Sequence, residues 1–153
     1  MKKLIIFFLV FVMLLCSAAF PVAATESTQN IVYLEDGSYI VTTIVELDTH
    51  GSRSNTKVGS KTTSGYSADN VLQWKITVTG EFQYDGTTSS CTYASGVTNV
   101  VKTLYWEVIR ESSTAGSTTA YYNVTFAHWE LGVVIDRPTY GVSISCDPDG
   151  NLY

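Results

Sequence analysis

The sequence contains few of the residues that build metal and nucleophilic centres. Its 153 residues include two histidines, His50 and His128, and three cysteines. Neither residue type occurs in the paired, short spacing that zinc sites use, so a metal centre is not expected. A serine-based triad would need one of the two histidines, and the nucleophile motif G-x-S-x-G does not occur. The sequence therefore predicts no metal, no cofactor and no catalytic residues.

Long hydrophobic runs are also scarce, and the single one lies at the N-terminus. It covers residues 4–15, about 12 residues, which is short of the roughly 20 that cross a bilayer as a helix. It follows a basic start (MKK) and precedes small residues that end at Ala24, the pattern of a secretory signal peptide cleaved after Ala24. A membrane anchor is one alternative. A lipoprotein modified at Cys16 is another, disfavoured because two leucines precede the cysteine. We therefore expect a secreted, extracellular protein with a bacterial-type signal peptide and no stable membrane anchor.

Basic residues are few once this leader is removed. Lys2 and Lys3 leave with it, so seven of the nine basic residues remain against 14 acidic ones, a net charge of about −7. Nucleic acids and anionic membrane surfaces are held by basic patches. Both are therefore poor partners for so acidic a protein.

Two cysteines, Cys91 and Cys146, remain in the mature chain of about 129 residues. Exported proteins commonly join such a pair in a disulfide. Closing a loop of about 56 residues would stabilise the fold by roughly 4 kcal/mol. We expect one disulfide bond, and two buried thiols are the alternative.

Alternation of apolar and polar residues is the strongest structural signal. Over residues 71–84 the apolar side chains fall on one face and the polar ones on the other, with Gly80 as the interruption. Such alternation predicts a long strand with one buried face, and the glycine predicts a bulge or a bend. Asp85 and Gly86 supply turn chemistry, so this strand and residues 87–96 are predicted to form a hairpin.

Shorter patterns of the same kind cover much of the remaining chain. Further strands are predicted at residues 38–47, 99–110, 118–128, 129–135 and 140–146. About seven short strands without helical periodicity predict an all-β fold, an antiparallel β-sandwich that forms one domain over residues 38–153. The segments predicted to lack strands are a polar, loosely docked start at 25–37, a long loop or weak edge hairpin at 48–70, and a connection at 112–117.

The spacing of Cys91, Trp106 and Cys146 is similar to that of immunoglobulin domains, where a tryptophan packs on a disulfide between the sheets. The match is partial, because Ile144 stands where a tyrosine is expected and seven residues follow Cys146. The spacing predicts an immunoglobulin-like architecture with a disulfide between the sheets, and it leaves the strand order open.

Aromatic residues are abundant, with ten tyrosines and three tryptophans. Tyr93, Tyr105 and Tyr121 are the candidate binding residues, because they point outward if their strand neighbours point inward. Exposed aromatic rings stack on sugars or bind peptides, whereas ordinary cross-strand pairing is the structural alternative. His128 continues the apolar face of residues 118–128 and is expected to be structural.

Carboxylates are numerous but show no catalytic spacing. A glycosidase needs two that face one cleft, and Glu107, Glu130 and Asp136 are candidates by number alone. The segment DPDGN, which begins at Asp147, suggests a calcium loop, but its glycine stands at the fourth position rather than the sixth. A turn is therefore expected there, as at the other Asp-Gly pairs.

Five segments of the mature chain, together with the leader, carry a family resemblance. They are LEDGSY (34–39) running into VTTIVE, WKITVTGEF (74–82), TSSC (88–91), LGVV (131–134) and CDPDGN (146–151). In these segments the chain resembles a group of small, uncharacterised secreted proteins of Gram-positive bacteria. The resemblance covers nearly the whole mature chain and implies no activity or functional residues.

These observations together predict a secreted binding or interaction module. Its expected ligand is a glycan, a peptide or another protein, held on a sheet face or on the 48–70 loop. The first alternative is a secreted protein that resembles a toxin or effector or is membrane-active. The second alternative is a small secreted hydrolase.

Overall fold

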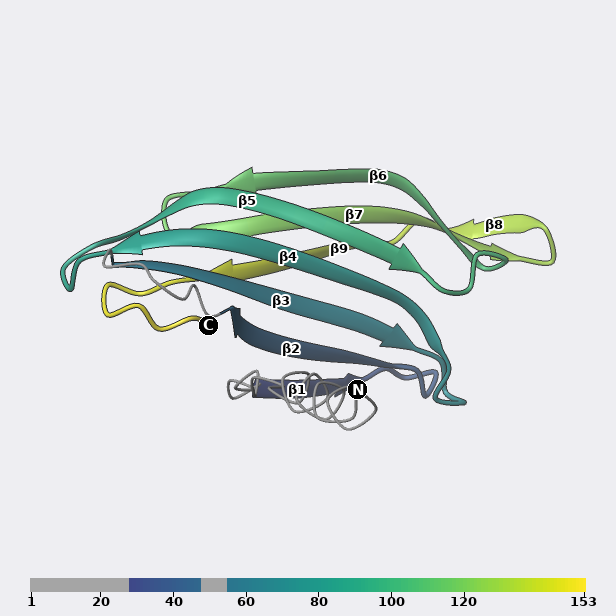
Figure 1. Ribbon diagram of the computed structural model, residues 1–153. Coiled ribbons are helices and arrows are strands. Elements are labelled where there is room, and N and C mark those ends of the chain that lie inside the picture. Colours follow the sequence, from purple (N-terminus) through teal and green to yellow (C-terminus); the bar gives the residue numbers. More distant parts are fainter. Residues whose placement is uncertain (1–27, 48–54) are drawn as a thin grey trace, which may run out of the picture.

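A computed structural model describes residues 28–47 and 55–153 of the chain (Figure 1). The predicted signal peptide and its cleavage site after Ala24 lie outside these residues. All regular elements in the described part are strands, and it contains no helix of the length and apolar character needed to cross a membrane. The strands are β1 (Thr28–Tyr33), β2 (Tyr39–Leu47), β3 (Thr56–Tyr66), β4 (Leu72–Tyr84), β5 (Ser89–Val100), β6 (Trp106–Ala115), β7 (Thr119–Glu130), β8 (Val133–Asp136) and β9 (Thr139–Ser145).

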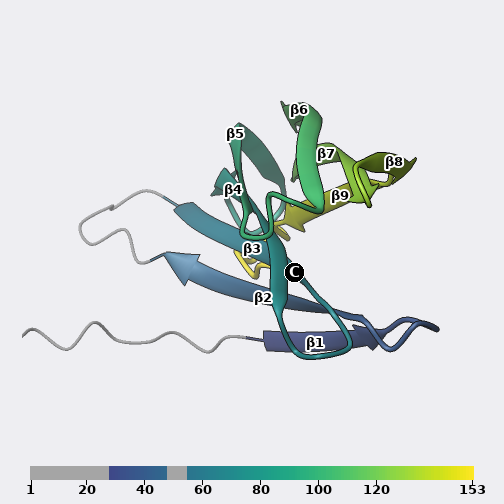
Figure 2. The same ribbon diagram turned by 90° about the vertical axis from the view of Figure 1, so that its right-hand side faces the viewer.

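The strands form two antiparallel sheets packed face to face (Figures 1 and 2). The first sheet has the order β1-β2-β3-β4-β5, and the second has the order β6-β7-β8 with β9 paired to β7. Figure 2 shows that the first sheet lies against the second through β3, β4 and β5, while β2 and β1 extend beyond it. The predicted all-β antiparallel sandwich is confirmed.

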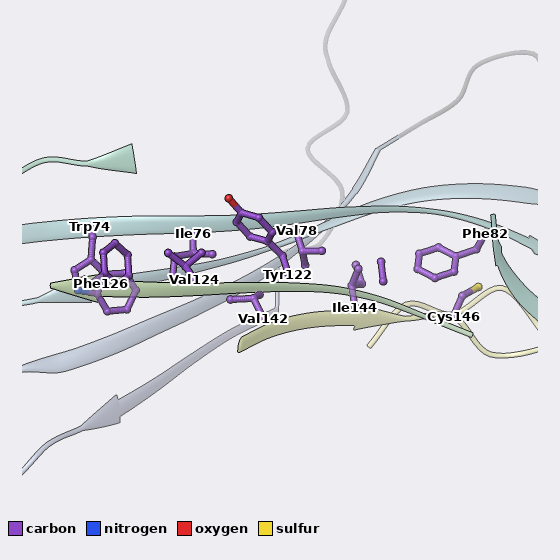
Figure 3. Packing of buried hydrophobic residues seen from close by; sticks show 11 residues of the cluster. Trp74, Ile76, Val78, Phe82, Tyr122, Val124, Phe126, Val142, Ile144 and Cys146 are labelled. Atoms are coloured by element: carbon purple, nitrogen blue, oxygen red, sulfur yellow. The ribbon is translucent and has the colours of Figure 1, made fainter. Parts of the chain in front are cut away.

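The core lies between β4 of the first sheet and β7 and β9 of the second (Figure 3). Its side chains, apart from Ala127, are those that the alternation placed on one face of each strand, and each exposes 4% or less of its surface. Burying an aliphatic or phenyl side chain of this kind contributes about 1.5–3 kcal/mol. The buried residues are Trp74, Ile76, Val78 and Phe82 on β4, Ala120, Tyr122, Val124, Phe126 and Ala127 on β7, Val142 and Ile144 on β9, and Cys146.

Gly80 continues the buried face of β4 rather than breaking it. A Cβ atom there would lie 2.6 Å from the Phe82 ring and 2.9 Å from the Ala120 Cβ, so the second sheet passes too close for a side chain. The register of β4 and β5 shifts at the next step, between Glu81 and Phe82, because Thr92 on β5 is skipped in the pairing. The predicted bulge is therefore present, one residue beyond Gly80.

The predicted Asp-Gly turns are also present. Gly86 has a φ of 83°, a left-handed conformation that glycine adopts without strain. The preceding Asp85 carboxylate accepts hydrogen bonds from the backbone of Thr87 at 2.9 Å and of Thr88 at 2.7 Å. Asp147 accepts three hydrogen bonds from within its own turn, so the DPDGN segment is a turn, as predicted.

Two segments that were predicted to lack strands form them. Residues 28–33 form β1 at the edge of the first sheet, paired with β2 along its length. In the segment 48–70, β3 lies between β2 and β4, and residues 48–54 are outside the described part. The loop prediction is wrong because the apolar side chains that pack against β3 belong to other parts of the chain, not to β3 itself. At Gly65, for example, a Cβ atom would lie 2.4 Å from the Trp74 ring.

Strand boundaries between residues 99 and 117 also differ from the prediction. β5 continues to Val100 and β6 begins at Trp106, so a loop divides the predicted strand 99–110. Leu104, which belongs to the predicted strand, lies in that loop with 84% of its surface exposed. Residues 112–115, expected to be a connection, complete β6. Alternation predicted one continuous strand here because Val100 and Trp106 both pack against the core, but they belong to different sheets.

The predicted disulfide between Cys91 and Cys146 is not formed in the structure, where both residues are free thiols. Each sulfur has its own carbonyl partner instead. The Cys91 Sγ donates to the Tyr93 carbonyl over 3.3 Å, and the Cys146 Sγ donates to the Asp147 carbonyl over 3.4 Å. Burial raises the pKa of both thiols, which keeps them protonated at neutral pH.

The comparison with immunoglobulin domains holds for the two-layer architecture alone. The first sheet is a meander in which five consecutive strands are neighbours, whereas immunoglobulin domains divide consecutive strands between sheets. Trp106 also does not pack against the cysteines. Its ring lies 6.3 Å from Trp74 and 5.7 Å from Phe126, and these two residues lie at the end of the core opposite to Cys146 (Figure 3).

Candidate functional site

A cleft of about 530 Å³ opens at one end of the sandwich. Residues of the β1–β2 turn, the β3–β4 turn, the loop before β6 and the second sheet line it. Alternate turns of an antiparallel meander lie at the same end of the sheet. For this reason the two turns and the loop meet, although they are far apart in the sequence (right-hand side of Figure 1).

A pair of stacked tyrosines lies at the edge of the cleft. Tyr39 of β2 and Tyr66 of β3 are paired in register, and their rings stack with centroids 4.9 Å apart and planes 5° apart. The ring pair lies on the outer face of the first sheet, because side chains alternate along a strand and the neighbouring Gly65 faces Trp74 in the core. Such cross-strand aromatic pairs stabilise a sheet, so Tyr39 and Tyr66 hold the rim of the cleft in place rather than supply its aromatic surface.

A second group of aromatic residues comes from the end of the core. The Trp74 ring centroid lies 4.5 Å from that of Tyr140 and 6.3 Å from that of Trp106. Phe126 supports this group from the core, with ring centroids 5.6 Å from Trp74 and 5.7 Å from Trp106. Since Trp74, Trp106 and Tyr140 all line the cleft, its inner surface is rigid and aromatic.

His128 lies in the cleft beside this group. Its ring stacks on Trp106 with centroids 4.2 Å apart and planes 4° apart. The side chain is half-buried and lines the cleft together with Asp136, its register partner on β8. His128 therefore packs against the core, as expected, and also lies at the candidate site.

Three carboxylates from three separate elements line the cleft: Asp36 in the β1–β2 turn, Asp69 in the β3–β4 turn and Asp136 at the end of β8. The Asp36 carboxylate accepts hydrogen bonds from the Ser38 hydroxyl at 2.6 Å and from the Ser38 backbone N–H at 3.0 Å. These bonds lower the pKa of Asp36, so this carboxyl group is ionised over a wide pH range. Within the described part of the chain, no lysine or arginine lines the cleft.

The negative charge reaches the aromatic surface. Burial raises the pKa of Tyr140, and the charges of Asp136 and Asp36 raise it further. A phenol is harder to ionise beside existing negative charges, so the contributions of Asp136 and Asp36, unlike that of burial, reflect a negative field at this ring. The cleft therefore combines aromatic walls with a negative electrostatic potential.

Of the three tyrosines predicted as binding residues, the structure brings one to the cleft. Tyr105, 50% exposed, lies in the loop before β6 and lines it. Tyr93 is paired with the exposed Glu81 on the outer face of the first sheet. Tyr121 is exposed on the outer face of the second sheet. The three tyrosines therefore do not form one surface.

The carboxylates considered for hydrolysis are also dispersed. Asp136 lines the cleft, whereas Glu107 and Glu130 are exposed and lie outside its lining. In residues 28–47 and 55–153, no group of three or more Asp, Glu, His or Cys side chains is arranged to hold a metal ion.

Sequence reasoning missed most of the cleft residues, among them Tyr39, Tyr66, Asp36 and Asp69. A signal was present, because an aspartate and a tyrosine adjoin both the first and the third turn of the meander. It could not be used while β3 was taken for a loop, since the two turns then had no reason to meet.

Comparison of the chain with models of protein families, with curated proteins and with solved structures finds no match. The candidate function therefore rests on the site itself.

Proposed function

We propose that this protein is a secreted binding module whose ligand occupies the cleft between the turns. The observation that carries the proposal is the aromatic-walled cleft itself. Its volume of about 530 Å³ falls within the roughly 300–1,000 Å³ typical of ligand sites. A few polar groups on turns surround its aromatic surface, an arrangement that gives a ligand both contact area and orientation.

Binding is favoured over hydrolysis because Asp36, one of the three cleft carboxyl groups, does not fit the role of a glycosidase acid. A glycosidase acid must hold its proton near neutral pH, so its pKa is raised. The pKa of Asp36 is instead lowered, by its hydrogen bonds with Ser38. In addition, the one histidine in the cleft stacks on Trp106 rather than hydrogen-bonding to a nucleophile.

Export and oxidation belong to the same proposal. The signal peptide of residues 1–24 would release a chain that begins at Thr25, as in the small secreted proteins of Gram-positive bacteria that the sequence resembles. Cys91 and Cys146 lie near each other in the fold, since the hydroxyl of Ser89 on β5 donates to the Cys146 carbonyl at 2.6 Å. We therefore propose that they form a disulfide once the protein is outside the cell.

Mass spectrometry of the exported protein tests both statements. The expected result is an N-terminus at Thr25 and no thiol that reacts with a maleimide after denaturation. Two reactive thiols would leave the export proposal standing and refute the disulfide.

Ligand binding is tested by probing glycan and peptide arrays with residues 25–153, and by repeating the assay with cleft variants. Trp106→Ala and Tyr105→Ala should abolish any signal that depends on the cleft. Tyr93→Ala is the matched control, because Tyr93 is 53% exposed and Tyr105 is 50% exposed, but Tyr93 lies on the outer face of the first sheet. Equal loss in Tyr105→Ala and Tyr93→Ala would contradict the assignment of the cleft.

A further inference from the structure

We propose that the cleft selects a ligand carrying an organic ammonium group, such as a quaternary ammonium or an amino sugar. This inference rests on the proposed function, because it names the chemistry of the ligand in the same cleft. Two features of the cleft carry it: the acidic residues around it and its aromatic lining. Together they favour a cationic ligand over a neutral or an anionic one.

The charged residues that line the cleft, within the part of the chain that the structure describes, are all acidic. Asp36, Asp69 and Asp136 approach it from three different elements. The nearest basic residues along the described chain, Lys102 and Arg137, are exposed and are not part of the lining. A cation entering the cleft would therefore meet carboxylates on more than one side and no basic side chain among the described lining residues.

The aromatic lining supplies the second element of ammonium recognition. A cation is attracted to the negative face of an aromatic ring within about 6 Å, most strongly when the ring is tryptophan. Trp106 and Tyr140, both partly exposed, line the cleft together with the exposed Tyr105, and the buried Trp74 supports them from behind. Rings fixed by mutual stacking cost little entropy when a ligand binds, because they are already ordered.

Other ligand classes fit these features less well. An anionic ligand would be repelled by the three carboxylates. A neutral ligand would displace water from charged groups without neutralising them, and this desolvation opposes binding. An ammonium group neutralises the carboxylates and places its carbon substituents against the rings.

The test compares matched ligands that differ in charge. Choline is titrated against 3,3-dimethyl-1-butanol, its neutral carbon analogue, and glucosamine is titrated against glucose. Binding to residues 25–153 is followed by tryptophan fluorescence at low salt. We expect at least one of the two ammonium ligands to bind about tenfold more tightly than its neutral partner. Its affinity should fall several-fold when salt is added, because the charges lie at the protein surface. Tighter binding of choline would identify a quaternary ammonium as the ligand group, and tighter binding of glucosamine would identify an amino sugar.

Aspartate variants provide the control within the protein. Asp69→Asn and Asp136→Asn should each weaken ammonium binding about threefold or more, since each removes one carboxylate charge from the cleft. Asp149→Asn makes the same chemical change in the exposed C-terminal turn, outside the lining, and should leave binding unchanged. Equal melting temperatures would show that all three variants are folded.

The outcomes separate this inference from the proposed function. If a neutral sugar or peptide from the arrays binds in a Trp106-dependent manner, and neither ammonium ligand exceeds its neutral partner, the cleft is a binding site and the ammonium proposal is wrong. Equal binding by Asp69→Asn, Asp136→Asn and the unmodified protein would also overturn it. If no array component and no ammonium ligand depends on Trp106, both proposals fail.

Discussion

Substitution of Gly96 by alanine is the most direct test of how closely the two sheets approach. Gly96 lies on the inner face of β5, where it pairs with the buried Val78 of β4. Tyr122 of the opposite sheet covers it, and a Cβ atom on Gly96 would lie 2.1 Å from two atoms of the Tyr122 ring. The tyrosine cannot simply turn aside, because its hydroxyl lies 3.0 Å from the Thr98 hydroxyl and donates to Glu111 at 2.7 Å.

The size of the effect follows from this geometry. Real side chains do not tolerate a contact of 2.1 Å, so either β5 or the Tyr122 ring must move. Overpacking in a filled core costs about 1–3 kcal/mol, and loss of a hydrogen bond adds about 1 kcal/mol. Replacing glycine also restricts the unfolded chain, which returns about 0.5–1 kcal/mol. The expected net destabilisation by Gly96→Ala is therefore about 2 kcal/mol.

Urea denaturation followed by tryptophan fluorescence measures this cost. Gly141→Ala is the matched control, because its Cβ would meet only the exposed, movable Asn123 side chain. It should change the free energy of unfolding by less than about 0.5 kcal/mol. The double variant Gly96→Ala, Tyr122→Ala should lose less than the two single variants together, because the added methyl group enters the space that the ring has left. Additive losses, or a Gly96→Ala variant as stable as the control, would refute the close approach of β5 to Tyr122.

Two further predictions concern the core and the turns. Phe82→Ala should lower the free energy of unfolding by about 3–5 kcal/mol, because this ring is fully buried. The exposed neighbour Gln83→Ala should change it by less than about 0.5 kcal/mol, and equal losses in urea denaturation would contradict the strand register. Hydrogen bonds lower the pKa of Asp36, Asp85 and Asp147 below the ordinary value of 3.8. Their stabilisation is therefore complete above about pH 4 and is lost as the pH falls through the lower folded-state values. When the pH is lowered below 4, the melting temperature of the unmodified protein should fall by more than that of a variant with asparagine at all three positions. An identical fall in both proteins would argue against the turn carboxylates as its cause.

The part of the fold that the sequence predicted is the part in which one face is buried. In β4, β7 and β9 the buried apolar residues recur at every second position over most of the strand, because each strand packs one face against the other sheet. The turns at Gly37, Gly86 and Gly150 were recognisable because a left-handed glycine close to a hydrogen-bonding aspartate (Asp36, Asp85 and Asp147) is a local property. Neither signal depends on distant residues.

β3 escaped prediction because what holds it in the sheet is not local. Its two glycines are required by neighbours: a Cβ on Gly59 would lie 2.3 Å from Leu152, and one on Gly65 would lie 2.4 Å from Trp74. Its threonines pair with those of adjacent strands, as Thr62 does with Thr77, with their hydroxyl oxygens 2.9 Å apart. A polar, glycine-containing segment of this kind has the composition of a loop until its neighbours are known.

The candidate site could be predicted less well than the fold. Alternation indicates on which face of a strand a side chain lies, but it does not indicate which sheet covers that face or which ends of strands meet. Tyr93, Tyr105 and Tyr121 were equivalent by that criterion, and the structure places them on two outer faces and in one loop. Tyr105 alone reaches the cleft, because the loop that carries it lies at the same end as the β1–β2 and β3–β4 turns.

The cleft divides into residues that hold the fold and residues that are free to change. Trp74 is 2% exposed and contacts three other aromatic rings, so its removal would lower stability and disturb the inner wall of the cleft. Asp36 and Asp69 lie on exposed turns that contribute nothing to the core cluster. A chain that keeps the alternation of β4, β7 and β9 but changes these turns would therefore keep the sandwich and alter the charge of the cleft. If the cleft binds a ligand as proposed, the turns set the ligand preference of such a protein, and the strands set its stability.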